Sequence, residues 1–313
     1  MKERDGKRSR KAEPQDSRLH MLILFLTAMI WGSSFVSAQS GIQSMPPLTF
    51  NCLRLLIAGT CLLPVIAVGR SYRHARERKA AGTRTGLPDI GTACRSALPG
   101  GIICGLILGA ASGLQQVGLL YTTVGRSGFI TALYIVLIPI FSLVLGRKLG
   151  KNVWIAAAVS VCGLYFICMG DENGINKGDL FTMACAVCYA VHILAVDHFS
   201  KDKDPLIFSC IQFYAGGILM LPFPVLSGGL TAESVNAAGF CLFYSGAVGC
   251  CAGFTLQTIG QQGVRPAIAS LILSLESCFA ALFGFLILHQ SLSPRELLGC
   301  ALMFAAIVLS QKE

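Results

Sequence analysis

Long apolar runs separated by short polar segments dominate the pattern of this sequence. The hydrocarbon core of a bilayer is about 30 Å thick, and a helix of about 20 residues crosses it. Runs of that kind lie at residues 20–40, 46–69, 97–121, 127–146, 152–170, 179–198, 205–226, 237–259, 266–288 and 295–311. Backbone amides in lipid must be hydrogen-bonded within their own segment, and these runs are too long and too apolar for barrel strands. The pattern therefore predicts an all-α integral membrane protein with ten transmembrane helices.

The chain also contains an internal repeat. The segment PLTFNCLRLLIAGTCLLP from Pro47 returns as PLIFSCIQFYAGGILMLP from Pro205, 158 positions later. The pattern Leu-Gln-x-x-Gly at Leu114 returns at Leu256. Each copy would hold five spans, and because five is odd the second copy enters the bilayer from the opposite side, as an inverted-topology repeat. We predict a basic tail at 1–19, a first five-helix unit at 20–170 and a second at 171–313.

The distribution of charge predicts the orientation. The chain carries 25 Lys and Arg residues against 16 Asp and Glu residues, a formal net charge of +9. Seven of the basic residues precede the first apolar run, and seven more lie between Arg70 and Arg95. Lys and Arg are enriched in short cytoplasmic segments. Both termini are therefore predicted in the cytoplasm, with the protein in the cell (inner) membrane and only Arg126, Lys177 and Arg295 in external loops.

Several function classes are disfavoured by what the sequence lacks. The basic segments have neither the aromatic interleaving nor the fold of a nucleic-acid reader. Most of the 14 cysteines lie inside apolar runs and are interpreted as small buried residues. Neither H-E-x-x-H nor G-x-x-x-x-G-K-[ST] occurs, and the histidines are scattered. We expect no metal site, no cofactor and no enzymatic activity. A membrane enzyme and a channel remain the rival classes.

Four short motifs occur in an order that is informative. They are Trp31-Gly32-Ser33-Ser34-Phe35, Arg54 in the second run, Gly128-Phe129-Ile130-Thr131-Ala132-Leu133-Tyr134 followed by Pro139, and Gly178-Asp179-Leu180. With these motifs, residues 20–311 resemble the EamA family of the drug/metabolite transporter superfamily. The resemblance implies an exporter-like fold of ten helices with a substrate cavity between the halves, lined mainly by the first, third, fourth, sixth, eighth and ninth helices. Family members move amino acids, other metabolites or drugs, and related branches move nucleotide sugars and sugar phosphates.

Two ionisable residues lie deep within apolar runs. Insertion of such a residue costs about 2.5–3.5 kcal/mol, so each is a functional candidate. Arg54 lies about eight residues into the second run and Glu276 about ten into the ninth, close to mid-membrane depth at about 1.5 Å per residue. We expect Arg54 to hold a carboxylate or phosphate, and Glu276 to bind an ammonium group or a coupling proton. The alternative is structural: an Arg54–Glu276 ion pair, or Arg54 bonded to backbone carbonyls.

Neutral polar and aromatic residues complete the candidate site. Amides in the third and eighth runs can bind a polar substrate without the cost of a charge, or can serve as ordinary interhelical hydrogen bonds. A histidine in the sixth run, opposite Ser34 in the repeat, suits either a proton relay or hydrogen-bonded packing. Aromatic residues can wall the cavity or stack on a cation. The predicted substrate-binding residues are Trp31, Ser34, Arg54, Gln115, Tyr134, His192, Gln257 and Glu276.

Together these features predict a secondary active transporter that works by alternating access, with export of a small polar metabolite such as an amino acid as the favoured activity. A multidrug or cationic-compound transporter and a nucleotide-sugar transporter are the alternatives. No nucleotide-binding motif occurs, so the energy must come from a coupling proton or an exchanged solute. The expected partners are a small-molecule substrate and membrane lipid, with no nucleic acid. The sequence leaves open whether two copies form a homodimer.

Overall fold

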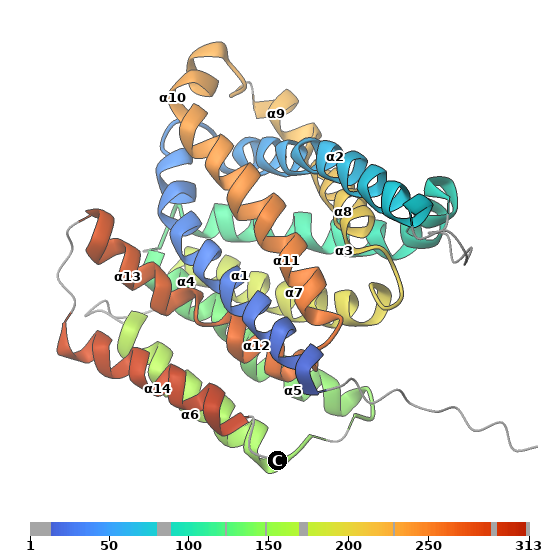
Figure 1. Ribbon diagram of the computed structural model, residues 1–313. Helices are drawn as coiled ribbons and strands as arrows, with labels where there is room; N and C mark the ends of the chain where they lie inside the picture. The colour runs from blue at the N-terminus through green and yellow to red at the C-terminus, as the bar shows by residue number, and fades with distance from the viewer. Residues whose placement is uncertain are drawn as a thin grey trace, which may run out of the picture.

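The computed structural model describes residues 14–79, 89–122, 124–147, 149–168, 175–227, 229–288 and 293–310. Most of the predicted basic tail and the middle of the second basic segment lie outside these ranges. The described residues form helices joined by short turns (Figure 1). The helices are α1 (Pro14–Gly41), α2 (Pro47–Lys79), α3 (Ile90–Gly118), α4 (Val124–Ala132), α5 (Tyr134–Val144), α6 (Lys151–Cys168), α7 (Lys177–Phe199), α8 (Pro205–Met220), α9 (Pro222–Ser227), α10 (Ala232–Phe243), η1 (Tyr244–Ala252), α11 (Gly253–Gln261), α12 (Pro266–Leu273), α13 (Glu276–Leu288) and α14 (Pro294–Ser310).

The prediction of an all-helical membrane protein is confirmed, and eight helices among the described residues are long and apolar enough to cross a bilayer. They are Ser17–Gly41, Pro47–Tyr72, Ile90–Gly118, Arg126–Val144, Lys177–Phe199, Pro205–Ser227, Ala232–Gln261 and Pro266–Phe283. The fifth and tenth predicted runs correspond to α6 and α14, which have 18 and 17 residues. At about 1.5 Å per residue these two helices reach only about 26 Å. Ten spans therefore stay a prediction.

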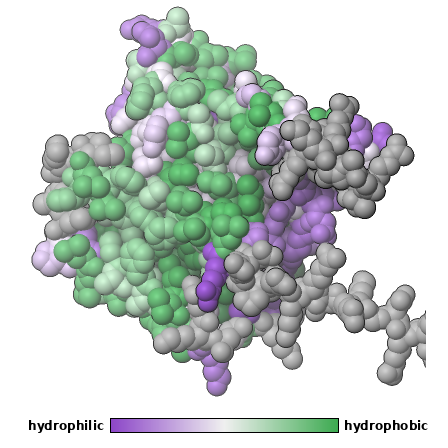
Figure 2. Space-filling model, viewed as in Figure 1, coloured by the Kyte–Doolittle hydropathy of each residue, from purple (hydrophilic) through white to green (hydrophobic). Residues whose placement is uncertain are grey.

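The outer surface is apolar. Large hydrophobic side chains are exposed on nearly every long helix, and Val144, Val225 and Leu226 are each at least 80% exposed. Figure 2 shows that hydrophobic residues cover most of the visible face and that hydrophilic residues gather at its edges. An exposed apolar surface of this extent would promote association in water, whereas lipid tails solvate it without cost.

Two of the predicted runs are broken near their middle. The fourth is interrupted at Leu133, between α4 and α5, and the ninth at Ser274 and Leu275, between α12 and α13. At both breaks the amides bond three residues back, as in Leu133 to Ile130 and Leu275 to Ile272. The Ser274 hydroxyl also donates to the Leu271 carbonyl, which competes with the regular helical bond. Irregular backbone at this depth is tolerated where protein or a polar cavity surrounds it.

The first helix of each predicted unit packs mainly against the other unit. Helix α1 contacts η1, α11, α12 and α13, whereas α7 contacts α3, α4 and α5. In Figure 1, α1 runs beside α11. Each predicted unit therefore packs its first helix into the other unit. Helices from both predicted units surround the space between α1 and α7.

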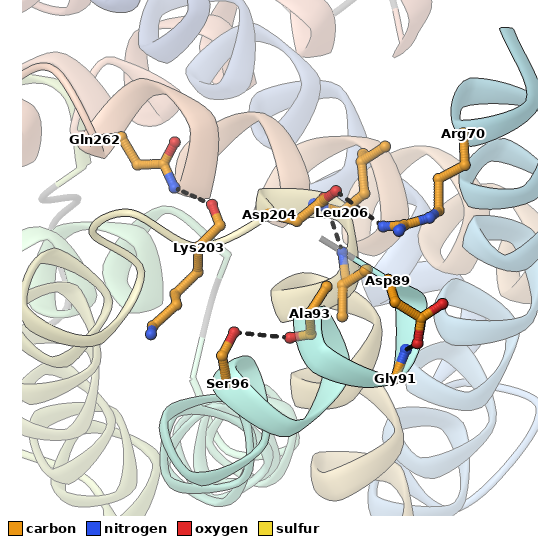
Figure 3. Close-up of polar contacts among 10 residues, drawn as sticks. Arg70, Asp89, Gly91, Ala93, Ser96, Lys203, Asp204, Leu206 and Gln262 are labelled. Carbon is orange, nitrogen blue, oxygen red and sulfur yellow. Dashed lines mark hydrogen bonds and ion pairs between the residues drawn. The ribbon is translucent and has the colours of Figure 1, made fainter. Parts of the chain in front are cut away.

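Polar contacts hold one end of the bundle, which we call the basic face: the ends of α2, α5, α7 and α11 and the starts of α3 and α8. Arg147 Nη1 donates to Asp197 Oδ2 at 2.9 Å. Arg70 Nη1 lies 3.9 Å from Asp204 Oδ2. Gln262 Nε2 donates to the carbonyl of Lys203, and Figure 3 draws both contacts. Asp204 also accepts the first amides of α8, and Asp89 caps α3 in the same way. Several helix ends are thus joined by side chains here.

A buried ion pair holds the opposite face. Arg126 Nη2 donates to Asp179 Oδ2 at 2.6 Å, which joins the start of α4 to the start of α7. Asp179 also accepts from the Thr122 hydroxyl at 3.1 Å and the Asn176 amide at 2.8 Å. Both charged side chains are at most 10% exposed. The sequence predicts Arg126 in an external loop, but the residue lies in the first turn of α4, as Lys177 does in α7 and Arg295 in α14. The external position of this face stays a prediction.

Glycines allow the closest helix contacts. Gly101, Gly105 and Gly109 form a stripe of every fourth residue on α3 that packs against α8, where a Cβ added at Gly109 would lie 3.0 Å from the Gly216 carbonyl oxygen. In the same way Gly163 on α6 meets Gly299 on α14. The stripe therefore serves tight packing in this structure.

Replacing Gly299 by valine is expected to separate α14 from α6. A Cβ at this position would lie 2.6 Å from the Gly163 carbonyl oxygen, so the helices must move apart. Overpacking of this kind costs about 1–3 kcal/mol. The thermal midpoint of the purified protein in detergent should fall, whereas Ala305→Val, at an exposed position of α14, should leave it unchanged. Equal midpoints for the two variants would contradict the tight contact.

Candidate functional site

A cavity lies between the two predicted units, near the middle of the helices. Its volume is about 60 Å³. This is room for roughly four to six ordered waters. It extends toward the opposite face, where Ala38 and Leu119 lie close to the ends of α1 and α3. The lining residues are Trp31, Ser34, Phe35, Ala38, Arg54, Gln115, Gln116, Leu119, Thr131, Tyr134, Tyr189, Ile193, Gly249, Cys250, Phe254, Gln257 and Glu276.

Seven of the eight predicted site residues line this cavity. The exception is His192, whose side chain is fully buried outside it. The lining comes from α1, α3, α4, the start of α5, α7, η1, α11 and the start of α13, with Arg54 contributed by α2. Whether the seven residues bind a substrate stays a prediction, but the fold brings them from distant parts of the chain to one place.

The cavity holds two opposite charges that do not pair with each other. Arg54 is 7% exposed and Glu276 is 6% exposed. Among the described residues neither side chain forms an ion pair, so the structural alternative of an Arg54–Glu276 bridge is absent from this structure. The Arg54 Nε donates to Asn51 Oδ1 at 3.0 Å, and the Asn51 amide nitrogen donates to the Gly109 carbonyl at 3.4 Å. Asn51 thus positions the guanidinium group while leaving its outer nitrogens for another partner.

The broken helices supply a matched pair of polar groups. Tyr134 is the first residue of α5 and Glu276 is the first residue of α13, and both follow a break. The buried Tyr134 hydroxyl interacts with Glu276 but forms no hydrogen bond shorter than 3.5 Å among the described residues. The start of a helix carries a partial positive charge, which favours a negative charge beside it. Half-helix ends of this kind form binding sites at the centre of many transporters.

Amide groups line both sides of the cavity. Gln115 Nε2 donates to Thr131 Oγ1 at 3.4 Å, and Gln257 Nε2 donates to Gln261 Oε1 at 2.8 Å. The buried oxygens Gln116 Oε1 and Gln257 Oε1 have no hydrogen-bond partner within the described ranges. Because an unpaired buried polar atom costs about 1–3 kcal/mol, these acceptors favour a polar occupant.

Aromatic side chains form one wall. Trp31 and Phe254 lie with their ring centroids 4.8 Å apart. The Trp31 indole nitrogen donates to the Gly249 carbonyl at 3.1 Å, within the π-helix η1. A π-helical turn is rare and occurs mostly at functional sites. No pattern in residues 244–252 predicted this π-helical turn.

The cavity also contains residues that were not predicted. Tyr189 could have been found, because it lies 158 positions after Trp31 and therefore occupies the same place in the repeat. Phe35 and Phe254 are typical apolar residues of a membrane helix, and nothing in their spacing separates them from lipid-facing positions. The described residues contain no group of three or more His, Cys, Asp or Glu side chains suited to a metal ion.

Comparison with known proteins supplies the family. The sequence profile of the EamA-like transporter family matches residues 18–169 and, a second time, residues 176–311. An uncharacterized transporter of Archaeoglobus fulgidus is 30% identical over 292 residues, which cover 91% of this chain and 83% of that protein. The uncharacterized inner membrane transporter YedA of Escherichia coli is 23% identical over 292 residues, covering 91% and 88%. Protein PecM of Dickeya dadantii is 24% identical over 298 residues, covering 92% and 90%.

A solved crystal structure has a similar fold. It superimposes with a TM-score of 0.70 at 18% sequence identity, and the match covers 94% of this chain and 96% of that chain. At this identity the likeness extends to the fold alone.

Proposed function

The chain belongs to the EamA-like transporter family, and from that premise we propose that this multi-pass membrane transporter carries a small metabolite with an anionic and a cationic group, such as an amino acid. The supporting observation is the pair of unbridged charges in the cavity, Arg54 and Glu276. Each costs about 2.5–3.5 kcal/mol in a bilayer. A carboxylate bound by Arg54 and an ammonium group bound by Glu276 would offset both costs at once.

The transport mechanism we propose is alternating access by two inverted five-helix units, residues 20–170 and 171–313, with ten spans and both termini in the cytoplasm. The double match of the family profile supports two units. The equivalent breaks before Tyr134 and Glu276 support a common internal plan. Two inverted copies have two nearly equivalent packings, one open to each side of the membrane.

The proposed energy source is an ion or solute gradient, and the proposed direction is export. Glu276 is the candidate site for a coupling proton, because it lines the cavity at the start of a half-helix. Exchange for a second solute is the other route by which such a carrier can be driven.

A cationic compound is the second candidate substrate. Trp31, Tyr189 and Phe254 line the same cavity as Glu276, and aromatic faces attract cations when desolvated. A nucleotide sugar is disfavoured, since the space for roughly four to six waters is small for such a molecule.

Reconstitution into liposomes tests the proposed function. We expect saturable uptake of one or more zwitterionic amino acids from a panel that also contains nucleotide sugars and cationic drugs. A preloaded unlabelled substrate should accelerate uptake by counterflow, because a carrier returns faster when it is loaded. An imposed pH gradient should change the rate if a proton is coupled.

Protein-free liposomes provide the control. Flux that rises linearly with concentration would indicate a pore and contradict the carrier. Saturable uptake of cationic drugs alone would replace the zwitterion by the second candidate substrate.

A further inference from the structure

The helices of the two units correspond to each other at fixed sequence offsets. Positions in the first two spans of each unit lie 158 residues apart, and positions in the last three lie 142 apart. The helix boundaries follow the same offsets. The matching boundaries are the ends of α1 and α7 at Gly41 and Phe199, the starts of α2 and α8 at Pro47 and Pro205, the starts of α4 and α12 at Val124 and Pro266, and the starts of α5 and α13 at Tyr134 and Glu276.

This register divides the cavity lining into two groups. Four equivalent pairs both line the cavity: Trp31 with Tyr189, Phe35 with Ile193, Gln115 with Gln257, and Tyr134 with Glu276. At other positions only one unit contributes, and Gly249, Cys250 and Phe254 line the cavity from the second unit without their equivalents in the first. Ser34, Ala38 and Arg54 line the cavity, whereas their equivalents His192, Val196 and Gln212 are buried. At these three positions the first unit faces the cavity, whereas the second unit is closed off from it.

The buried equivalents of Ser34 and Arg54 touch each other. His192 Nε2 lies 3.3 Å from Gln212 Oε1, and both side chains have no exposed surface. The amide oxygen only accepts, so His192 Nε2 donates and a neutral ring leaves Nδ1 as an acceptor. His192 Nδ1 and Gln212 Nε2 have no hydrogen-bond partner in the described part of the chain. Two side chains in contact thus leave one acceptor, His192 Nδ1, and one donor, Gln212 Nε2, without partners among the described residues.

An aromatic ring and a polar chain separate this pair from the cavity. Phe254 lines the cavity on one side and packs edge-on against His192 on the other, with ring centroids 6.1 Å apart. Gln261 accepts from Gln257 and donates to the Ile193 carbonyl at 2.9 Å, which ties α11 to α7. The position equivalent to Gln261 is Leu119, which cannot form such a link and which lines the open side.

We propose that His192 and Gln212 form a second substrate site, which is closed in this structure and faces the cavity when the transporter opens toward the basic face. The inference rests on the proposed function, because exchange of the two packings places the second unit where the first now stands. Gln212 then donates to the substrate carboxylate and His192 accepts from its ammonium group. The site recognises the same zwitterion as Arg54 and Glu276, but without a formal charge on Gln212.

The absence of that charge makes the two sites unequal. Hydrogen bonds to charged groups are roughly twice as strong as those between neutral groups. Substrate is therefore held more tightly on the Arg54 side and released more readily on the Gln212 side.

Labelling of single cysteines tests the proposal. The native cysteines are replaced by serine or alanine, and transport by the resulting protein in liposomes is verified. Gln212→Cys and Val196→Cys are then treated with a membrane-impermeant sulfonated maleimide from each side of the membrane. We expect both to react only from the face opposite to the one that labels Arg54→Cys and Ala38→Cys. Ala156→Cys, buried between α6 and α14, should not react from either side.

Failure of both Gln212→Cys and Val196→Cys to react, with Ala38→Cys reacting, would overturn the second site. If Gln212→Cys does not yield folded protein, Val196→Cys decides alone, since it removes no hydrogen bond. Saturable flux without this labelling contradicts only the second site. Labelling without flux of any zwitterion contradicts only the proposed substrate.

Discussion

Arg54→Gln is expected to raise the substrate concentration for half-maximal transport by about 10- to 100-fold. The substitution places at position 54 the residue found at the equivalent position 212 and keeps a polar, though shorter, side chain. It removes a charge-assisted hydrogen bond, worth about 1.5–3 kcal/mol, and about 1.4 kcal/mol corresponds to a tenfold change in affinity. Initial rates of uptake into liposomes across a range of substrate concentrations provide the measurement.

Two further variants make this result specific. Arg54→Lys keeps the charge but loses the forked geometry, and should fall between the native protein and Arg54→Gln. Arg95→Gln removes an exposed arginine from the start of α3 and should not change the half-maximal concentration. If Arg54→Gln also leaves that concentration unchanged, Arg54 has a structural role and the charge-pair substrate is wrong.

Asp179→Ala is expected to lower the free energy of unfolding by about 3–5 kcal/mol. The substitution leaves the buried Arg126 without its carboxylate and deprives the Thr122 hydroxyl and the Asn176 amide of their acceptor. The cost comes mainly from the stranded positive charge rather than from the lost attraction. The thermal midpoint in detergent should fall by several degrees or more.

A double variant separates the cost of the buried, unpaired charge from the loss of the attraction between the two side chains. Arg126→Met combined with Asp179→Leu removes both charges and should recover much of the lost stability, because apolar replacements avoid the desolvation cost. Lys201→Ala serves as the comparison, because it breaks the ion pair between Lys201 and Asp197. The Lys201 side chain is 55% exposed, and such exposed pairs contribute about 0–1 kcal/mol. A thermal midpoint for Asp179→Ala no lower than that of Lys201→Ala would contradict the role assigned to the buried pair.

The sequence predicted the helical membrane fold and the main polar residues of the cavity lining because both follow from the cost of polar groups in lipid. Arg54 and Glu276 are rare charges within apolar runs, and such groups are placed where protein or a polar cavity surrounds them. Gln115 and Gln257 were found through the repeat as well as through their polarity. Two independent signals at one position make the prediction strong.

Other features depend on contacts that a linear pattern does not contain. Arg126 was assigned to a loop because its partner, Asp179, lies 53 positions away and only the folded chain brings the two together. His192 was placed in the cavity because depth was inferred from sequence but rotation about the helix axis was not. The breaks at Leu133 and Ser274 occur without glycine or proline at the break itself, so the composition of these runs predicts continuous helices.

The exchange of first helices constrains how the chain is made. Helix α1 is synthesised first, but the helices it packs against begin only at Ala232, about 190 residues after α1 ends. At about 5–20 residues per second, the ribosome needs roughly 10 to 40 seconds to produce them. During that time α1 stands in the bilayer without its permanent neighbours. Biogenesis therefore requires the first helix made to dock onto helices from the last third of the chain, and a nascent chain that stops at residue 170 leaves α1 without its partners.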